Sequence, residues 1–204
     1  MREIDPKSAP LTQIFNLITG GIAPRPIALV STVSEEGIDN LAPFSFFNAF
    51  GANPPIVAFS PARRSRDGTT KDTYNNLMEN QECVIQVVTY DIVHQVNLAS
   101  EEFDKNISEF KKSGLTPIPS QRVKPKRVKE SPFQMECKLQ QMIPLGEKKG
   151  SGNLAICEVL LFHVAEDLLE DDQIHPDRIR LVGRNGGSFY TKATGSAIFE
   201  LPKP

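Results

Sequence analysis

The chain has 204 residues and a net charge of -2, which is enough length for one domain with a sizeable core and gives no global sign of a nucleic-acid or anionic-membrane partner. No apolar run approaches the roughly 18 residues of a membrane helix, and the charged start does not resemble a secretory signal. We therefore expect a cytoplasmic protein with a single domain over residues 1–204 and no nucleic-acid or membrane partner.

In the first half of the chain, short apolar runs alternate with glycine and proline turns. Helical spacing predicts two short helices, at 11–18 (ended by the glycines at 20–21) and at 71–80. Runs rich in β-branched and aromatic residues predict three strands, at 27–33, 40–50 and 56–60, with a hairpin turn at 34–37. The strand at 40–50 is unusual, because Pro43 in its interior cannot donate a hydrogen bond to a neighbouring strand.

The second half continues this pattern of short elements. Apolar runs predict strands at 82–90, 134–143, 154–165 and 178–184, the last followed by a glycine turn and a returning segment. Helices are expected at 91–100, with Asp91 as its cap, and near 107–113, ending at Gly114. The run at 154–165 is apolar on both faces, so we expect a second cover for it, such as another subunit.

Residues 115–132 differ from the rest of the chain, because four prolines are combined with five lysines and arginines. This composition predicts an extended basic excursion rather than a packed element. A solvated loop is the favoured interpretation, and a flap near an anionic ligand is the alternative.

The sequence thus predicts about seven strands and a few short helices, with neighbouring strands joined by turns. The regular alternation of strand and helix that marks a parallel sheet is missing. We therefore expect a mainly β protein, an antiparallel barrel or sandwich with a few peripheral helices.

The strongest local signal for a ligand is RRSRDGTTKDT at 63–73. Hydroxyl groups and the cationic side chains of Arg63, Arg64, Arg66 and Lys71 gather there, at the expected start of a helix. Helix N-termini, hydroxyls and lysine all favour phosphate, so this segment is a candidate phosphate site. The spacing of Thr69 and Asp72 also resembles a capping box, and an ordinary capped helix behind a solvated loop is the alternative. Patterns of a dinucleotide fold or a P-loop are missing.

The strand at 40–50 could complete such a site. Its proline would leave backbone groups unpaired, its phenylalanines could stack, and Ser45 or Asn48 could bond the edge of a flat heteroaromatic ring. An edge strand with a bulge is an equally good interpretation of the same residues.

The cysteines and histidines do not point to a catalytic or metal site. The three cysteines lie in strand-like runs, which favours buried, reduced thiols, and the spacing of cysteines and histidines predicts no metal site. His163 is expected on the same face as Cys157 and Val159, more often a structural position than a catalytic one. No catalytic acid or base stands out, so an enzyme with this sequence would rely on a cofactor.

Three segments together carry a family resemblance: residues 24–60, the KDTYNNL sequence at 71–77, and GRNGGSFY at 183–190. Over about residues 20–192 the chain resembles the flavin reductase-like proteins of the flavoredoxin group. The resemblance implies an FMN-binding, Greek-key split β-barrel that forms a homodimer, with FMN reduced by NAD(P)H.

The resemblance also implies roles for individual residues. The isoalloxazine ring would be lined by Asn40, Ala42, Pro43, Ser45, Phe46, Phe47 and Asn48. The ribityl chain and phosphate would be held by Ser60, Lys71, Asp72 and Thr73, with Asp72 acting through capping. Arg184 and Tyr190 would lie near the site, and His163 is a weak candidate for a polar contact with the flavin.

We therefore expect an NAD(P)H:flavin reductase-like enzyme. One alternative is an FMN electron-transfer protein that a partner protein reduces. Another is a non-enzymatic β-barrel module that binds a different phosphorylated ligand.

Overall fold

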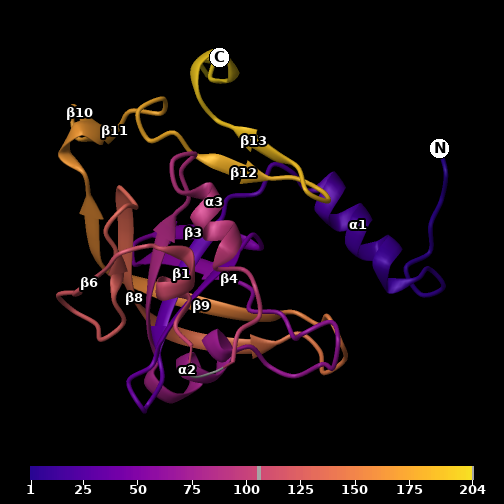
Figure 1. The fold of residues 1–204 in the computed structure, drawn as a ribbon. Coiled ribbons are helices and arrows are strands. Elements are labelled where there is room, and N and C mark those ends of the chain that lie inside the picture. Colours follow the sequence, from indigo (N-terminus) through magenta and orange to yellow (C-terminus); the bar gives the residue numbers. More distant parts are fainter. Residues whose placement is uncertain (105–106, 204) are drawn as a thin grey trace.

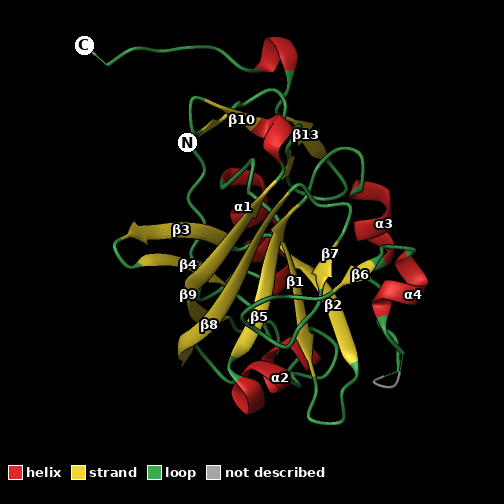
Figure 2. Cartoon of the chain, turned by 90° about the vertical axis from the view of Figure 1, so that its left-hand side faces the viewer, coloured by secondary structure: helices red, strands yellow, loops and turns green. Residues whose placement is uncertain are grey.

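The computed structural model describes residues 1–104 and 107–203. Its centre is a seven-stranded antiparallel sheet (Figure 1), and Figure 2 labels its strands, whose order is β2-β1-β5-β8-β9-β4-β3. Its strands are β1 (Ala28–Val33), β2 (Asp39–Phe44), β3 (Phe47–Ala52), β4 (Pro55–Phe59), β5 (Glu82–Val87), β8 (Phe133–Pro144) and β9 (Asn153–Val164). The expected mainly β, antiparallel fold is confirmed.

The single strand predicted at 40–50 is wrong. The chain bends at Ser45 and Phe46, and its two halves, β2 and β3, form opposite edges of the sheet. Because two residues join these edges, the sheet must curl until they approach one another, and it forms the rolled barrel of Figure 2. Pro43 is tolerated because β2 pairs only with β1 and so leaves one side free of ladder bonds.

Two hydrophobic cores lie on the two faces of β1. Ala28 and Val30 face a core inside the barrel, which also contains the tilted pair Phe44 and Phe59, with ring centroids 5.2 Å apart. Leu29 faces a second core outside the barrel, shared with helices and loops. The alternation of β1 therefore places apolar residues on both faces, as expected for a strand covered on both sides.

The described residues form four α-helices: α1 (Leu11–Gly21), α2 (Asp72–Asn80), α3 (Val93–Leu98) and α4 (Glu109–Ser113). Helix α2 contributes Leu77 to the inner core, α3 and α4 pack beside β2, and α1 stands away from the barrel (Figure 1). Two boundary predictions are wrong. Helix α1 runs through the glycines expected to end it, and Asp91 pairs with Arg180 at 2.8 Å rather than capping α3.

The predicted excursion at 115–132 is largely exposed, as expected for a solvated loop, but a few buried residues fix it to the barrel. Its short strands β6 (Pro117–Ile118) and β7 (Arg127–Val128) pair, and Val128 is fully buried in the outer core. Buried polar groups hold the segment, because Gln134 Nε2 donates to the Val128 carbonyl at 2.8 Å. Arg127 is also largely buried and donates to Gln134 at 3.0 Å. The other basic side chains of the segment are exposed, and these are Arg122, Lys124, Lys126 and Lys129.

The chain ends in short elements above one end of the barrel (Figure 2). These are the 3-10 turn η1 (Glu166–Leu168), the strands β10 (Leu169–Glu170), β11 (Gln173–Ile174), β12 (Val182–Arg184) and β13 (Tyr190–Lys192), and the 3-10 turn η2 (Gly195–Ala197). The predicted final strand with a glycine turn and return is confirmed by the pairing of β12 with β13. Within the described residues, no helix is long and apolar enough to cross a membrane.

Candidate functional site

A groove follows the free side of β2. It consists of two adjoining cavities of about 180 and 100 Å³, and Pro43 and Ser100 line both of them. The strand and the residues at the end of α3 form its two walls. Its inner end lies at the start of α2, and its outer end lies at β12 and β13. The groove therefore brings together segments that are far apart in the sequence.

Lys71 is the central cation at the inner end. Its ammonium lies 5.4 Å from the centroid of the Phe44 ring, and among the described residues no group accepts a hydrogen bond from it. Burial lowers the pKa of Lys71, and the neighbouring charge of Arg64 lowers it further. A mostly buried ammonium with no hydrogen-bond partner is costly, so this position suits an anion supplied by a ligand.

Arg64 adds a second cation at the same end. Its Nη2 atom lies 3.1 Å from a carboxylate oxygen of Asp72, and its Nε atom lies 3.7 Å from Glu102. The predicted capping box is wrong, because α2 has Lys71 at its N-cap position and no side chain caps it. Asp72 instead occupies the first turn of α2 and pairs with Arg64.

A buried network fixes the floor of this end. The Asn40 amide nitrogen donates to the hydroxyls of Thr32 and Thr73, each at 3.0 Å, and the Asn76 amide donates to Thr32 at the same distance. Asn40, Thr73 and Asn76 are all buried, so strand β2 and helix α2 are held together at the groove.

The outer end contains a residue that the sequence analysis missed. Arg25 is 6% exposed, and its guanidinium donates to the carbonyls of Thr19, Ile22 and Asn185 and to the Ser45 hydroxyl. Burial lowers the pKa of Arg25, and the charge of Arg184 lowers it further. The sequence feature that could have indicated Arg25 is a cationic residue between two prolines, immediately before a buried strand.

Arg184 and Tyr190 line the groove close to Arg25. The Arg184 guanidinium lies 4.5 Å from the Tyr190 ring centroid and donates to the Gly187 carbonyl at 2.7 Å. Among the described residues, no carboxylate forms a salt bridge with Arg25 or Arg184. The outer end of the groove is therefore positively charged, whereas the inner end combines Arg64 and Lys71 with carboxylates.

The structure brings most of the predicted site residues to this groove. The residues that line it are Asn40, Ala42, Pro43, Ser45, Lys71, Asp72, Thr73, Arg184 and Tyr190. Phe46, Phe47, Asn48 and Ser60 lie outside it. Phe47 faces an apolar cavity beside β12, while Asn48 is exposed on β3 and accepts a hydrogen bond from Ala49. Ser60 donates its backbone N–H to Phe46 at 2.9 Å.

The other two arginines of the predicted anion segment differ from Arg64. Arg63 donates through Nη1 to the Gly68 carbonyl at 3.0 Å, whereas its buried Nε has no hydrogen-bond partner in the part of the chain that the structure describes. Arg66 is two-thirds exposed and pairs with Asp67 and Glu102.

His163 lies away from the groove and on the opposite face from the one predicted. Cys137 pairs with Val159 but Glu136 pairs with Leu161, so a bulge reverses the alternation of β9 before His163. His163 Nε2 lies 2.6 Å from a carboxylate oxygen of Glu136. The structural interpretation of His163 is therefore the one that the geometry supports.

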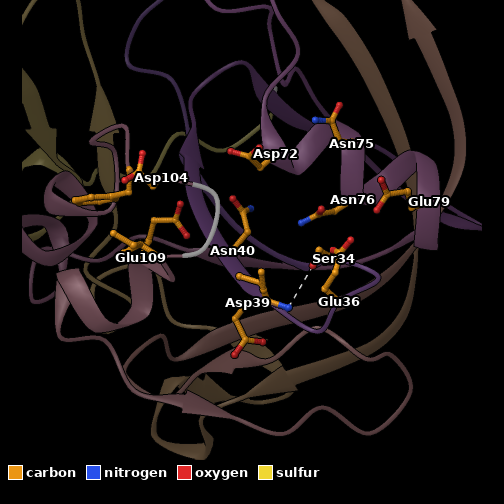
Figure 3. Close-up of a pocket in the computed structure, with 13 residues that line it drawn as sticks. Ser34, Glu36, Asp39, Asn40, Asp72, Asn75, Asn76, Glu79, Asp104 and Glu109 are labelled. Carbon is orange, nitrogen blue, oxygen red and sulfur yellow. Dashed lines mark hydrogen bonds between the residues drawn. The ribbon is translucent and has the colours of Figure 1, made fainter.

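A larger cavity of about 350 Å³ adjoins the inner end, and Asn40, Asp72 and Glu109 line both spaces (Figure 3). Six carboxylates line it, from Glu36, Asp39, Asp72, Glu79, Asp104 and Glu109. Burial raises the pKa of Glu109, while the Leu41 amide that it accepts at 2.9 Å opposes that shift. The carboxylates of this larger, acidic cavity, which has no lysine or arginine among the described residues that line it, disfavour an anion there.

The cysteines and metal-binding residue types carry no site. All three cysteines are buried and free, as predicted. Among residues 1–104 and 107–203, no group of three or more histidine, cysteine, aspartate or glutamate side chains is placed to hold a metal ion.

Comparison with known proteins identifies the family. Residues 20–182 match the flavin reductase like domain, and the chain belongs to the flavin reductase-like family. An uncharacterized protein of Halalkalibacterium halodurans is 37% identical over 204 residues, covering 99% of this chain and 96% of the relative. An uncharacterized protein of Aquifex aeolicus is 37% identical over 189 residues, covering 92% and 94%.

Solved structures agree with this assignment. The chain is similar to nitrilotriacetate monooxygenase component B from Bacillus cereus, with 37% identity, a TM-score of 0.92 and 98% of each chain covered. It is also similar to 2-nitrobenzoate 2-nitroreductase from Pseudomonas fluorescens, with 29% identity, a TM-score of 0.85, and coverage of 98% of this chain and 96% of the other. The fold is that of the split-barrel flavin reductases.

Proposed function

We propose that the protein is an FMN-dependent oxidoreductase that takes a hydride from NAD(P)H, and that the groove along β2 holds the FMN. The observation that carries this proposal is the mostly buried Lys71 ammonium, which has no hydrogen-bond partner among the described residues, in a member of the flavin reductase-like family. A phosphate would supply the missing anion.

The groove residues fit such a ligand. Lys71, Arg64 and the first turn of α2 offer a cation pair and backbone amides to a phosphate, and helix N-termini favour anions. Pro43, Ser45 and Tyr190 border the remaining length with apolar and polar groups suited to a flat ring. Bound FMN would supply the hydride chemistry that these side chains lack.

The chain's own residues would bind and orient the cofactor. Asn40 and Thr73 would keep the floor rigid, since their hydrogen bond joins β2 to α2. Arg25 and Arg184 would keep a positive potential at the outer end. We assign no residue as a catalytic acid or base.

We also propose a cytoplasmic homodimer in which the exposed strand β3 contributes to the interface. Phe50 on this strand is 68% exposed, and Phe189 after β12 is 75% exposed. Large exposed apolar side chains favour a partner surface. Phe46 and Asn48, which lie outside the groove, could then contact FMN at the interface.

One alternative is an FMN electron carrier reduced by a partner protein, and another is a β-barrel module for a different phosphorylated ligand. The solved relatives named as a nitroreductase and a monooxygenase component both favour redox chemistry. Stopped-flow mixing with NADH and NADPH separates the enzyme from the carrier, since the carrier reacts with neither.

The absorption spectrum of the purified protein after loading with FMN and desalting tests cofactor binding. A retained flavin spectrum supports the proposal. A colourless protein that cannot take up FMN contradicts it and favours the non-enzymatic module.

The double variant Lys71→Ala with Thr73→Ala tests the position of the phosphate, and the single variant Thr73→Ala separates the loss of its buried hydrogen bond with Asn40. Charge-assisted hydrogen bonds are worth roughly 1.5–3 kcal/mol each, so FMN binding should weaken by a few kcal/mol in a fluorescence titration. Riboflavin, which has no phosphate, should be affected much less. Lys138→Ala, on an exposed position of β8, serves as the control. Unchanged FMN affinity in the double variant would place the phosphate elsewhere.

A further inference from the structure

Glu102 connects the cations at the inner end of the groove. One of its carboxylate oxygens lies 2.7 Å from Arg66 Nη1, and the other lies 3.7 Å from Arg64 Nε. The residue also lines the inner cavity together with Lys71. A single carboxylate therefore contacts both Arg64 and Arg66 and shares the inner cavity with Lys71.

These contacts are of a kind that a ligand can replace. The side chains of Glu102 and Arg66 are 52% and 66% exposed, and exposed ion pairs contribute little to stability. Asp72 differs, because it lies in the first turn of α2 and holds Arg64 through Nη2. Asp72 can thus keep Arg64 in place while the Nε side of that guanidinium exchanges partners.

We propose that Glu102 competes with the cofactor phosphate for Arg64 and Arg66 and so sets the affinity of the groove for phosphorylated ligands. This inference rests on the proposed function. The phosphate must displace the Glu102 carboxylate from the guanidinium groups or share them with it. In either case the negative charge of Glu102 opposes binding, and its removal strengthens binding.

The chain offers a matched control in the preceding residue. Glu101 carries the same charge, lies on the same segment and lines the same cavity, but it forms no salt bridge among the described residues. A general effect of lost negative charge would appear equally in Glu101→Gln and Glu102→Gln. A specific effect through Arg64 and Arg66 appears only in Glu102→Gln.

The experiment measures the dissociation constants of FMN and riboflavin for the wild-type protein and both variants by fluorescence titration, with thermal unfolding as a check of folding. Glu102→Gln should bind FMN about three- to tenfold more tightly, because an exposed ion pair contributes at most about 1 kcal/mol and two such pairs are released. Its affinity for riboflavin should stay within about twofold of the wild-type value, and Glu101→Gln should shift FMN affinity by less than about twofold.

The outcomes separate this inference from the proposed function. If the wild-type protein binds FMN but Glu102→Gln leaves its affinity unchanged, or if Glu101→Gln has the same effect, the competition is overturned and the cofactor site stands. An equal gain for riboflavin also overturns it, because the effect would not involve the phosphate. If neither the wild-type protein nor Glu102→Gln binds FMN, both proposals fail together.

Discussion

Two charged side chains of opposite sign, the buried Glu136 and the partly buried Lys71, differ in the partners that the chain supplies. The carboxylate of Glu136 is fully buried and accepts hydrogen bonds from the backbone amides of residues 121, 122 and 123, while His163 and Arg127 lie beside it. The ammonium of Lys71 has no hydrogen-bond partner among the described residues.

This difference distinguishes a charge that stabilises the fold from a charge that is available to bind a ligand. A buried charge with every partner supplied by the chain holds that chain together, and here it fixes the 115–132 segment to β8. A buried charge without partners costs stability and is retained where a ligand completes it. The next three changes test this distinction, starting with the largest expected effect.

Replacing Glu136 with alanine should lower the free energy of unfolding by about 3–5 kcal/mol, because three backbone amides, Arg127 and His163 would lose the buried carboxylate that they contact. Urea denaturation measures the loss. FMN affinity of the folded fraction should be unchanged, since Glu136 lies outside the groove. Glu136→Gln, which keeps one acceptor oxygen, should lose less.

Glu136 also predicts a pH dependence. Burial alone would raise its pKa, but the hydrogen bonds from Gln121, Arg122 and His163 outweigh burial, and the net pKa lies below its ordinary value of 4.5. The stabilisation is therefore complete above that value and is lost as pH falls through the folded-state pKa. Denaturation curves from pH 7 down to strongly acidic pH should show a shallower acid loss in Glu136→Gln than in the wild-type protein.

Replacing Lys71 with methionine should have two opposite effects. Because burial lowers the pKa of Lys71, its charge costs stability at neutral pH, and removing that charge should raise the free energy of unfolding by up to about 1 kcal/mol. FMN binding should weaken at the same time. A thermal melt without ligand, paired with an FMN titration, measures both. A variant that loses stability as well as affinity would contradict the assignment of Lys71 as an unsatisfied ligand group.

The smallest expected effect belongs to Glu109→Gln in the acidic cavity. Its raised pKa means that the folded state holds the proton more tightly than the unfolded state does, so the wild-type protein loses stability as pH rises above 4.5. Glutamine still accepts the Leu41 amide and removes this cost, which should add less than about 1 kcal/mol at pH 7. Equal slopes of stability against pH in the two proteins would contradict this reading.

The local pattern of the sequence predicted most of the barrel, because each strand has its own apolar run and the turns carry glycine or proline. The split of 40–50 into β2 and β3 could not be predicted in this way, since Phe44 and Phe47 are equally apolar. The segment is divided into two strands because the closure of the sheet places β2 and β3 at opposite edges. The face of His163 was wrong for a similar reason, because a bulge that depends on pairing with β8 reverses the alternation.

The site was predictable where residues near in sequence act together, as in the segment from Arg64 to Thr73. Arg25 was not predictable, because its partners come from α1, from the bend at Ser45 and from Asn185. The packing of residues 115–132 was hidden for the same reason. The acceptor of its backbone hydrogen bonds, Glu136, belongs to the following strand. In the sequence, Glu136 looks like an ordinary polar residue on the solvent-facing side of that strand.

At the bend formed by Ser45 and Phe46, the barrel has a junction between two edge strands, β2 and β3. Strands β2 and β3 form no ladder of hydrogen bonds with each other in the described sheet. The barrel is held closed there by the covalent connection and by the hydrogen bond from Ser60 to Phe46. A molecule bound against Pro43 and Ser45 would hold β2 and β3 together at that junction. Cofactor occupancy and the opening of the β3–β4 hairpin would then be thermodynamically linked, with loaded protein exchanging its β3 amide hydrogens more slowly than empty protein.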